Sequence, residues 1–247
     1  MPDPRDLHAV ERNARELAER ALREDGIRDV TSLATVAERQ NGVAVIEARA
    51  AMVFAGRRYA DAVIAACGLA PIEWQVHDGE PVDGPRAVAI VRGDLRAILR
   101  AERPLLNLLQ RASGIATMTR KAVDATAGTG CVVLHTRKTT PGLRTFEVRA
   151  VLDGGGGLHR VDLAHAVMVK DNHWQALRAQ GRTLASGRNA ARARGVAELQ
   201  VEVESLAQVM EACEAGATRL AASRATRSGA TRWRVPTSSA PECSPTR

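Results

Sequence analysis

Apolar and polar positions follow two different periods over the first hundred residues. Residues 5–24 predict an amphipathic helix, because apolar residues recur there at helical spacing among charged ones. Residues 42–53, 72–77 and 86–92 favour strands, and 60–67 a short helix, with turns between them. This half of the chain is therefore predicted to form a mixed α/β layer. The apolar positions of the first helix are Leu7, Val10, Ala14, Leu17, Ala18 and Leu22.

Two further stretches complete the prediction for this half. The polar residues from Glu24 to Ser32 predict a compact turn. Pro104 suits the first turn of a second helix, whose apolar positions run from Leu105 to Thr119. Arg103 would then lie just before that helix, where it could reach an interface or a ligand, although taken alone it reads as a surface arginine.

After Gly130, short apolar runs alternate with helical patterns. Strands that alternate with helices at this spacing predict a parallel sheet, either open or closed into a barrel. Barrel enzymes assemble their sites from the carboxyl ends of several such strands. The expected strands are 131–135, 165–169 and 198–203, and the expected helices are 144–152, 175–194 and 205–215.

Composition narrows the class of protein. The 247 residues are 45% hydrophobic and contain no uninterrupted apolar run of membrane-spanning length, so a soluble globular protein is expected. The first twenty residues lack the apolar core of a signal peptide, which predicts a cytoplasmic location and no membrane partner. The cysteines form no CxxC pair and are predicted to be free, mostly buried thiols: Cys67, Cys131, Cys213 and Cys243.

The formal net charge of +7 raises the question of nucleic-acid binding. Residues from 221 onward hold five arginines against one acid, Glu242, so much of the excess lies there. Two phenylalanines, one tyrosine and three tryptophans offer little surface on which bases could stack. Nucleic acid is therefore a weak hypothesis for the partner.

Lysine is rare, and its positions are informative. Only three of the 35 basic residues are lysine, and two of them, Lys138 and Lys170, follow predicted strands. Either one alone would read as a surface lysine. Together with Thr136-Arg137 and His159-Arg160 between them, they predict a pocket for a small, highly anionic ligand.

Acidic and glycine residues add two weaker signals. Glu202 and Glu204 would share one face of a strand and could bind a metal or sugar hydroxyls, or pair with an arginine. Residues 154–157 are four glycines without the spacing of a dinucleotide fingerprint. A flexible loop is the simpler interpretation, and a backbone that passes close to a ligand and delivers His159 and Arg160 is the sharper one.

Several of these segments resemble quinolinate phosphoribosyltransferase, also called carboxylating nicotinate-nucleotide pyrophosphorylase. The similarity covers about residues 5–220 in unbroken order. It includes the polar turn before Ser32. Its other motifs are ERPLLNLLQRASGIAT at 102–117, TRKTTPGLR at 136–144, the glycine segment through His-Arg at 154–160, VKDNH at 169–173 and VEVESL at 201–206.

The resemblance implies a fold, a reaction and an assembly. The fold would be α/β, with an N-terminal α/β sandwich at 1–103, a partial α/β barrel at 104–220 that lacks its last βα units, and a disordered basic tail at 221–247. The reaction would join quinolinate to phosphoribosyl pyrophosphate, with Mg²⁺ as cofactor, and release pyrophosphate and CO₂ to give nicotinate mononucleotide in NAD synthesis. The chain would form a homodimer or a higher homo-oligomer.

The resemblance also implies a role for each candidate residue. Arg103 would reach across the dimer interface, and Lys170 and Glu202 would face the phosphoribosyl group. Lys138, Lys170 and Glu202 would be the catalytic residues. The quinolinate carboxylates would be held by Arg137, Lys138, His159 and Arg160, and Thr136 would be a further substrate-binding residue.

The pattern departs from the family near Leu220. Ser223 stands where the family has the aspartate of a Leu-Asp-Asn strand end, and the residues beyond it lack periodicity. A disordered tail produced by truncation or a shifted reading frame is the expectation. The alternative function is therefore an impaired or inactive remnant of the enzyme, or of its molybdenum-transport-associated paralogue, that keeps anion binding or subunit pairing.

Overall fold

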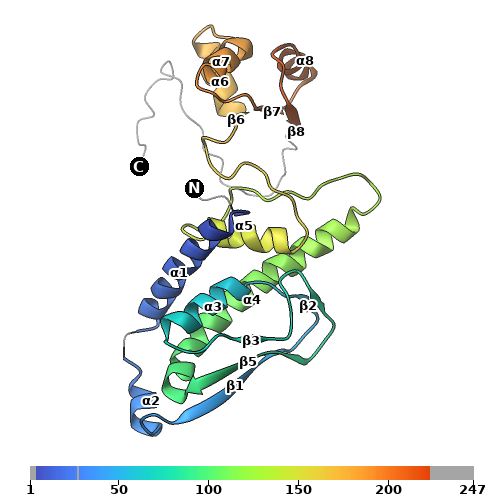
Figure 1. Ribbon diagram of the computed structural model, residues 1–247. Helices are drawn as coiled ribbons and strands as arrows, with labels where there is room; N and C mark the ends of the chain where they lie inside the picture. Colours follow the sequence, from blue (N-terminus) through green and yellow to red (C-terminus); the bar gives the residue numbers. More distant parts are fainter. Residues whose placement is uncertain (1–3, 27, 223–247) are drawn as a thin grey trace, which may run out of the picture. The chain divides into compact units, whose positions relative to one another are not determined.

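The computed structural model describes residues 4–26 and 28–222, which divide into two compact units between Val161 and Asp162. The N-terminal unit begins with helix α1 (Leu7–Glu24), as its apolar period predicted. The Asp6 carboxylate caps this helix by accepting a hydrogen bond from the His8 N–H at 3.0 Å. Figure 1 shows the order of the elements along the chain.

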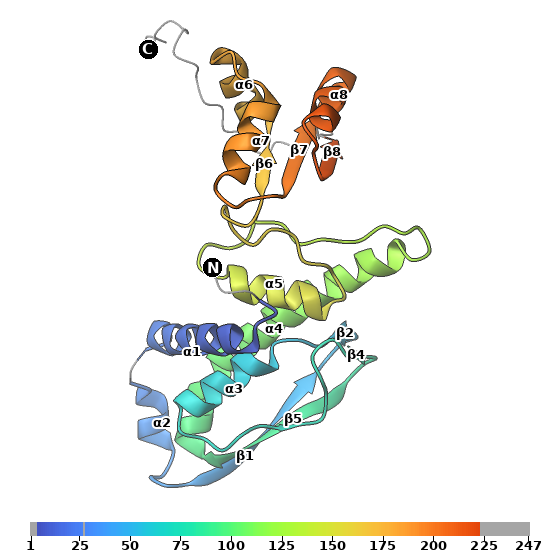
Figure 2. The same ribbon diagram turned by 45° about the horizontal axis from the view of Figure 1, so that its top comes forward.

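A small antiparallel sheet forms one layer of the N-terminal unit. Its strands lie in the order β1 (Asn41–Ala48), β5 (Arg86–Asp94), β3 (Glu73–Trp74). Two short strands, β2 (Met52–Val53) and β4 (Pro81–Val82), pair separately. Helix α3 (Arg57–Ala66) and the long helix α4 (Leu95–Ala125) lie over one face of the sheet in Figure 2. The mixed α/β layer predicted for this half is confirmed.

Helix α4 begins earlier than the sequence predicted. It runs from Leu95 to Ala125, so Pro104 lies in its interior and the expectation of a helix that starts at Pro104 is wrong. Asp94 ends β5 and caps α4 by accepting from the Ala97 N–H at 2.9 Å. Burial of Ile98 and Ala101 extends the apolar face upstream, which compensates for the backbone hydrogen bond that proline cannot donate. The predicted domain boundary at 103/104 falls inside this helix.

Two other expectations for the N-terminal unit were wrong. Within the predicted polar turn, Asp29 accepts from the Ser32 N–H at 3.0 Å and starts a short helix, α2 (Val30–Thr35). The predicted strand at 131–135 makes a single parallel bridge, Leu134 to Gly157, because the partner segment is a glycine turn too short for a ladder. Helix α5 (Arg144–Asp153) agrees with its prediction.

The C-terminal unit has the parallel sheet that the alternating pattern predicted. Its strands lie in the order β6 (Val167–Val169), β7 (Leu199–Val203), β8 (Arg219–Ala222). The helical pattern at 175–194 is two helices, α6 (Asp171–Ala179) and α7 (Leu184–Arg192), divided near Gly181, where φ is +62°. Helix α8 (Leu206–Glu214) follows β7.

Three remaining expectations concern the ends, the cysteines and membranes. Ala221 belongs to β8, and the rest of the predicted tail, from residue 223, lies outside the described residues. Cys67 is partly buried, whereas Cys131 and Cys213 are exposed free thiols, so the prediction of mostly buried thiols was wrong for the described cysteines. None of the helices in the described ranges has the length and apolarity needed to cross a membrane.

Candidate active site

The N-terminal unit brings the predicted cations at 136–138 and 159–160 together. The positive charge of Arg137 reaches Arg160, whose pKa is lowered by burial and by this neighbour. Arg137 Nε is buried and, within the described residues, has no hydrogen-bond partner. Thr136 and Lys138 are exposed beside it, and the Lys138 N–H donates to Thr136 Oγ1 at 3.2 Å. The arrangement concentrates positive charge around a donor that an anion could satisfy.

The glycine segment is a tightly packed connection, and the flexible-loop interpretation does not hold. The Gly157 N–H donates to Val133 O at 2.7 Å, and the His135 N–H donates to Gly157 O at 3.2 Å. A Cβ at Gly154 would lie 2.5 Å from the carbonyl oxygen of Ala116 on α4. Glycine is required here because the backbone passes directly against α4 and against the segment before Thr136.

His135 is a buried residue that the sequence interpretation missed. Its side chain lies between the two cationic segments, with Nδ1 3.3 Å from Thr136 O and Nε2 3.1 Å from His159 O. The His135 and His159 rings lie 6.4 Å apart, edge to face. One imidazole therefore connects both segments, and only its place directly before Thr136 could have drawn attention to it.

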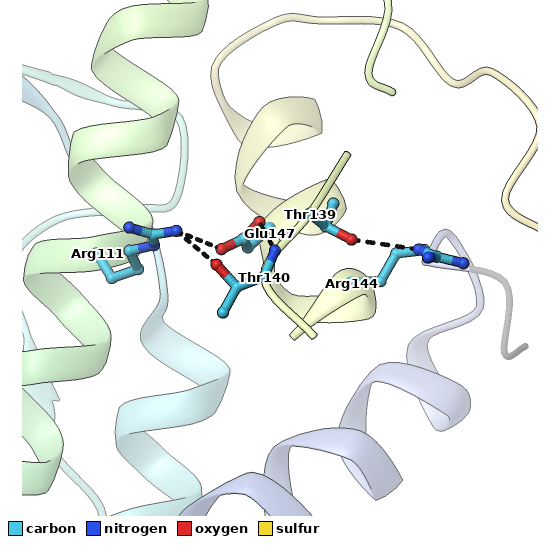
Figure 3. A network of polar contacts seen from close by, with 5 residues as sticks. All are labelled: Arg111, Thr139, Thr140, Arg144 and Glu147. Carbon is cyan, nitrogen blue, oxygen red and sulfur yellow. Dashed lines mark hydrogen bonds and ion pairs between the residues drawn. The ribbon is translucent and has the colours of Figure 1, made fainter. Parts of the chain in front are cut away.

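A second missed group anchors the far end of the 136–140 loop. Arg111 on α4 donates to Glu147 on α5 at 2.5 Å and to Thr140 Oγ1 at 2.9 Å, as Figure 3 shows. The signal in the sequence was a glutamate placed directly between the apolar residues Phe146 and Val148 of a predicted helix. Such a carboxylate is buried only with a partner, and that partner lies 36 positions away along the chain.

In the C-terminal unit, Lys170 and Glu202 form an ion pair. Val169 of β6 pairs with Val201 of β7 in the parallel sheet, so Lys170 and Glu202, which follow these two valines, are neighbours. Lys170 Nζ lies 2.9 Å from Glu202 Oε2. Trp174 on α6 donates from Nε1 to Glu202 O at 3.0 Å. The register and this indole hold the pair in place.

Two predicted residues lie differently from what was expected. Glu204 follows the end of β7 and is exposed, so it does not share a strand face with Glu202. Arg103 is exposed on α4, one position before Pro104, instead of preceding the helix. Across residues 4–26 and 28–222, no three histidine, cysteine or acidic side chains gather as a metal site.

Each unit thus offers a different chemistry. The N-terminal unit holds an arginine-rich cluster suited to carboxylates, which arginine binds in bidentate geometry. The C-terminal unit holds a lysine and a carboxylate at the carboxyl ends of neighbouring parallel strands, where ligand sites of parallel α/β folds are found.

Comparison with known families identifies both parts of the chain. Residues 29–113 match the family model described as quinolinate phosphoribosyl transferase, N-terminal domain, and residues 115–222 match the C-terminal domain of the same family. These two matches confirm the resemblance expected from the motifs.

Individual relatives agree with the family models. A probable nicotinate-nucleotide pyrophosphorylase [carboxylating] of Bacillus subtilis is 38% identical over 203 residues, which cover 79% of this chain and 67% of that protein. The carboxylating nicotinate-nucleotide pyrophosphorylase of Rattus norvegicus is 39% identical and covers 70% of this chain, which spans 58% of the rat protein.

Solved structures show the same fold. The nicotinate-nucleotide pyrophosphorylase of Francisella tularensis superposes with a TM-score of 0.78 at 30% identity, over 85% of this chain and 74% of that one. NadC from Streptococcus pyogenes has a TM-score of 0.76 at 36% identity, over 83% and 73% of the two chains. The chain belongs to the quinolinate phosphoribosyl transferase family.

Proposed function

We propose that this chain transfers the phosphoribosyl group of phosphoribosyl pyrophosphate to quinolinate and decarboxylates the product. The products are nicotinate mononucleotide, pyrophosphate and CO₂, a step of NAD synthesis. The relatives' names support this reaction. The observation that carries it in this chain is the buried Arg137 Nε beside Arg160, a donor that has no hydrogen-bond partner within the described residues.

Quinolinate suits this cluster because it carries two adjacent carboxylates. Arg137 and Arg160 supply guanidinium donors in a fixed plane, and Lys138 supplies a compact charge. Thr136 and His159 add further hydrogen-bonding groups at the same loops. Holding the ring in one orientation presents its nitrogen to the sugar and lowers the entropic part of the barrier.

The Lys170–Glu202 pair would face the phosphoribosyl group. As the bond from the sugar to pyrophosphate breaks, positive charge grows on the sugar and negative charge on the leaving group. Glu202 stabilises the first and Lys170 the second from fixed positions. The proposed catalytic residues are Lys170 and Glu202 together with Lys138, which contacts quinolinate.

Mg²⁺ is the proposed cofactor, and the residues present fit it. Magnesium in phosphate chemistry is commonly held by one or two carboxylates plus substrate oxygens, so a single carboxylate such as Glu202 would suffice with pyrophosphate oxygens. When bound, the ion would neutralise charge on the leaving pyrophosphate.

Decarboxylation follows from the first bond. Once the ring nitrogen carries the sugar it is positively charged, so it accepts the electron pair left when the 2-carboxylate departs as CO₂. A proton then adds to that ring carbon. The step needs no covalent attachment to the protein, and the role of Arg137 and Arg160 is to hold the carboxylates until then.

A homodimer is the proposed assembly, with Arg103 contributing to the site of the other copy. The position of Arg103 on the exposed face of α4 supports this role, because it leaves the guanidinium available to a partner. A cytoplasmic location remains a prediction.

A catalytically impaired remnant, or the molybdenum-transport-associated paralogue, is the less favoured alternative, since the relatives named above are pyrophosphorylases. Purified chain mixed with quinolinate, phosphoribosyl pyrophosphate and Mg²⁺ separates these functions. Release of CO₂ from quinolinate labelled at the 2-carboxylate, matched by nicotinate mononucleotide, is the expected result. Quinolinate binding without turnover would favour the remnant, and neither binding nor turnover would overturn the proposal.

A further inference from the structure

We propose that Glu147 and Arg111 are positioning residues for the substrate-binding loop, residues 136–140. They would fix the loop in the conformation that binds quinolinate, without contacting the substrate themselves. The inference rests on the proposed function, because that function assigns the loop to quinolinate.

Glu147 is the centre of the support. Its side chain is only 10% exposed, and Oε1 accepts from Arg111 while Oε2 accepts from the Thr140 N–H at 3.2 Å. Burial alone would raise the pKa of Glu147, but the hydrogen bonds from Arg111 and Thr140 hold it below its usual value of 4.5. The carboxylate therefore stays ionised and uses both oxygens at neutral pH.

Arg111 contacts both Glu147 and the side chain of Thr140. The same nitrogen that binds Glu147 also donates to Thr140 Oγ1 at 2.9 Å. Figure 3 shows Thr140 held at both its backbone and its side chain, with Arg111 coming from α4 and Glu147 from α5. Thr140 lies two positions after Lys138, so fixing it limits where the lysine can be.

Arg144 extends the network to the second cationic segment. Its Nε donates to Thr139 Oγ1 at 3.3 Å, and its Nη1 donates to Val161 O at 3.4 Å. Val161 directly follows Arg160, so one side chain connects both segments that the proposed function assigns to quinolinate. A loop fixed before the ligand arrives loses less conformational entropy on binding, which raises affinity.

Three variants test the inference. Glu147→Ala removes both acceptors, and Glu147→Gln leaves one acceptor oxygen for two donors. Arg149→Gln is the matched control, because Arg149 lies on the same helix and pairs with Asp153, whose side chain is 4% exposed, instead of with the loop. Both sites lose an ion pair to a mostly buried carboxylate, but only one of the two pairs supports residues 136–140.

Two readouts are needed: the Kd for quinolinate by calorimetry, and hydrogen exchange of the amides in residues 136–140. In Glu147→Ala we expect a Kd about 10- to 100-fold higher and faster exchange in the loop. Glu147→Gln should lie between Glu147→Ala and the unmodified chain. Arg149→Gln should leave the Kd within about twofold and the loop exchange unchanged, even if it lowers the melting temperature.

The inference would be overturned if Glu147→Ala showed the same loop exchange and the same quinolinate Kd as the Arg149→Gln control, both unchanged from the unmodified chain. Equal losses in Glu147→Ala and Arg149→Gln would also overturn it, because they would reflect general destabilisation. If the unmodified chain does not bind quinolinate, the proposed function fails, and loop exchange in the variants still decides whether the contacts of Glu147 with Arg111 and Thr140 order the loop.

Discussion

In the N-terminal unit Arg137 and Arg160 place two positive charges side by side, whereas in the C-terminal unit Lys170 is already paired with Glu202. In the first arrangement the nearby positive charge of Arg137 lowers the pKa of Arg160, and a bound anion would relieve this repulsion. The second is balanced in the free protein. The comparison indicates that two neighbouring positive charges select an anionic ligand. An ion pair, in contrast, is suited to a reaction in which charges of both signs develop.

Removal of Arg137 should have the largest effect. Arg137→Ala deletes the buried donor, and we expect the quinolinate Kd to rise about 1,000-fold, since truncating a buried charge partner costs roughly 2–5 kcal/mol. Arg137→Lys keeps the charge but not the fork and should recover only part of the affinity. Calorimetric titration measures both, and equal affinity in all three proteins would contradict the assignment.

Removal of Lys170 should separate binding from chemistry. Lys170→Ala should lower kcat on the order of 100-fold, because a pre-placed charge acts mainly on the transition state. The quinolinate Kd should stay within about twofold, since the proposed quinolinate group lies elsewhere. Steady-state kinetics with direct binding tests this prediction, and a large change in Kd with unchanged kcat would reverse the two roles.

Asp153 predicts how stability depends on pH in the N-terminal unit. Burial raises the pKa of Asp153 to about 6 from 3.8, with Asp78 adding to the rise and Arg149 opposing it. The folded state therefore binds this proton more tightly, so the contribution is fully present below pH 3.8 and is lost as pH rises through 6. The carboxyl should cost on the order of 3 kcal/mol above that range.

Asp153→Asn removes this titration. The stability of the unmodified chain minus that of the variant, from urea unfolding, should fall between pH 4.5 and 7.5. A difference that stays flat across this range would show that Asp153 keeps an ordinary pKa.

Two glycines give the smallest effects, of opposite sign. Gly154→Ala should destabilise the N-terminal unit by about 2 kcal/mol, because the new Cβ would meet Ala116 O at 2.5 Å. Gly187→Ala, inside α7 with its nearest side-chain atom at 3.9 Å, should stabilise the C-terminal unit by about 0.5–1 kcal/mol. Thermal unfolding measures both, and a Gly154→Ala variant that is as stable as the unmodified chain would contradict the packing described for residues 154–157.

The sequence predicted the elements whose periodicity is unbroken. Helix α1 buries the apolar residues that recur at helical spacing, strand β7 is buried at four of its five positions, and α5 and β6 also lie where they were predicted. The start of α4 was misplaced because Pro104 outweighed the apolar positions before it, although its neighbours in the helix supply the stabilisation that proline removes.

The candidate site was predictable only in part, for a related reason. Lys138 and Lys170 stood out because lysine is rare, and Arg137 lay beside one of them. Glu147 and Arg111 could not be paired in advance, because their contact depends on how α4 and α5 pack. The sequence shows which residues can bind or react, whereas the contacts that position them become known only from how the helices pack.

The most direct test compares quinolinate with nicotinate, which lacks the 2-carboxylate, in calorimetric titrations of the purified chain at constant pH and salt. The two adjacent cations Arg137 and Arg160 predict that quinolinate binds at least about tenfold more tightly, because the second carboxylate meets its own charge-assisted donors. Equal affinity for the two compounds, or no binding of quinolinate, would contradict the central claim that this cluster recognises a dicarboxylate.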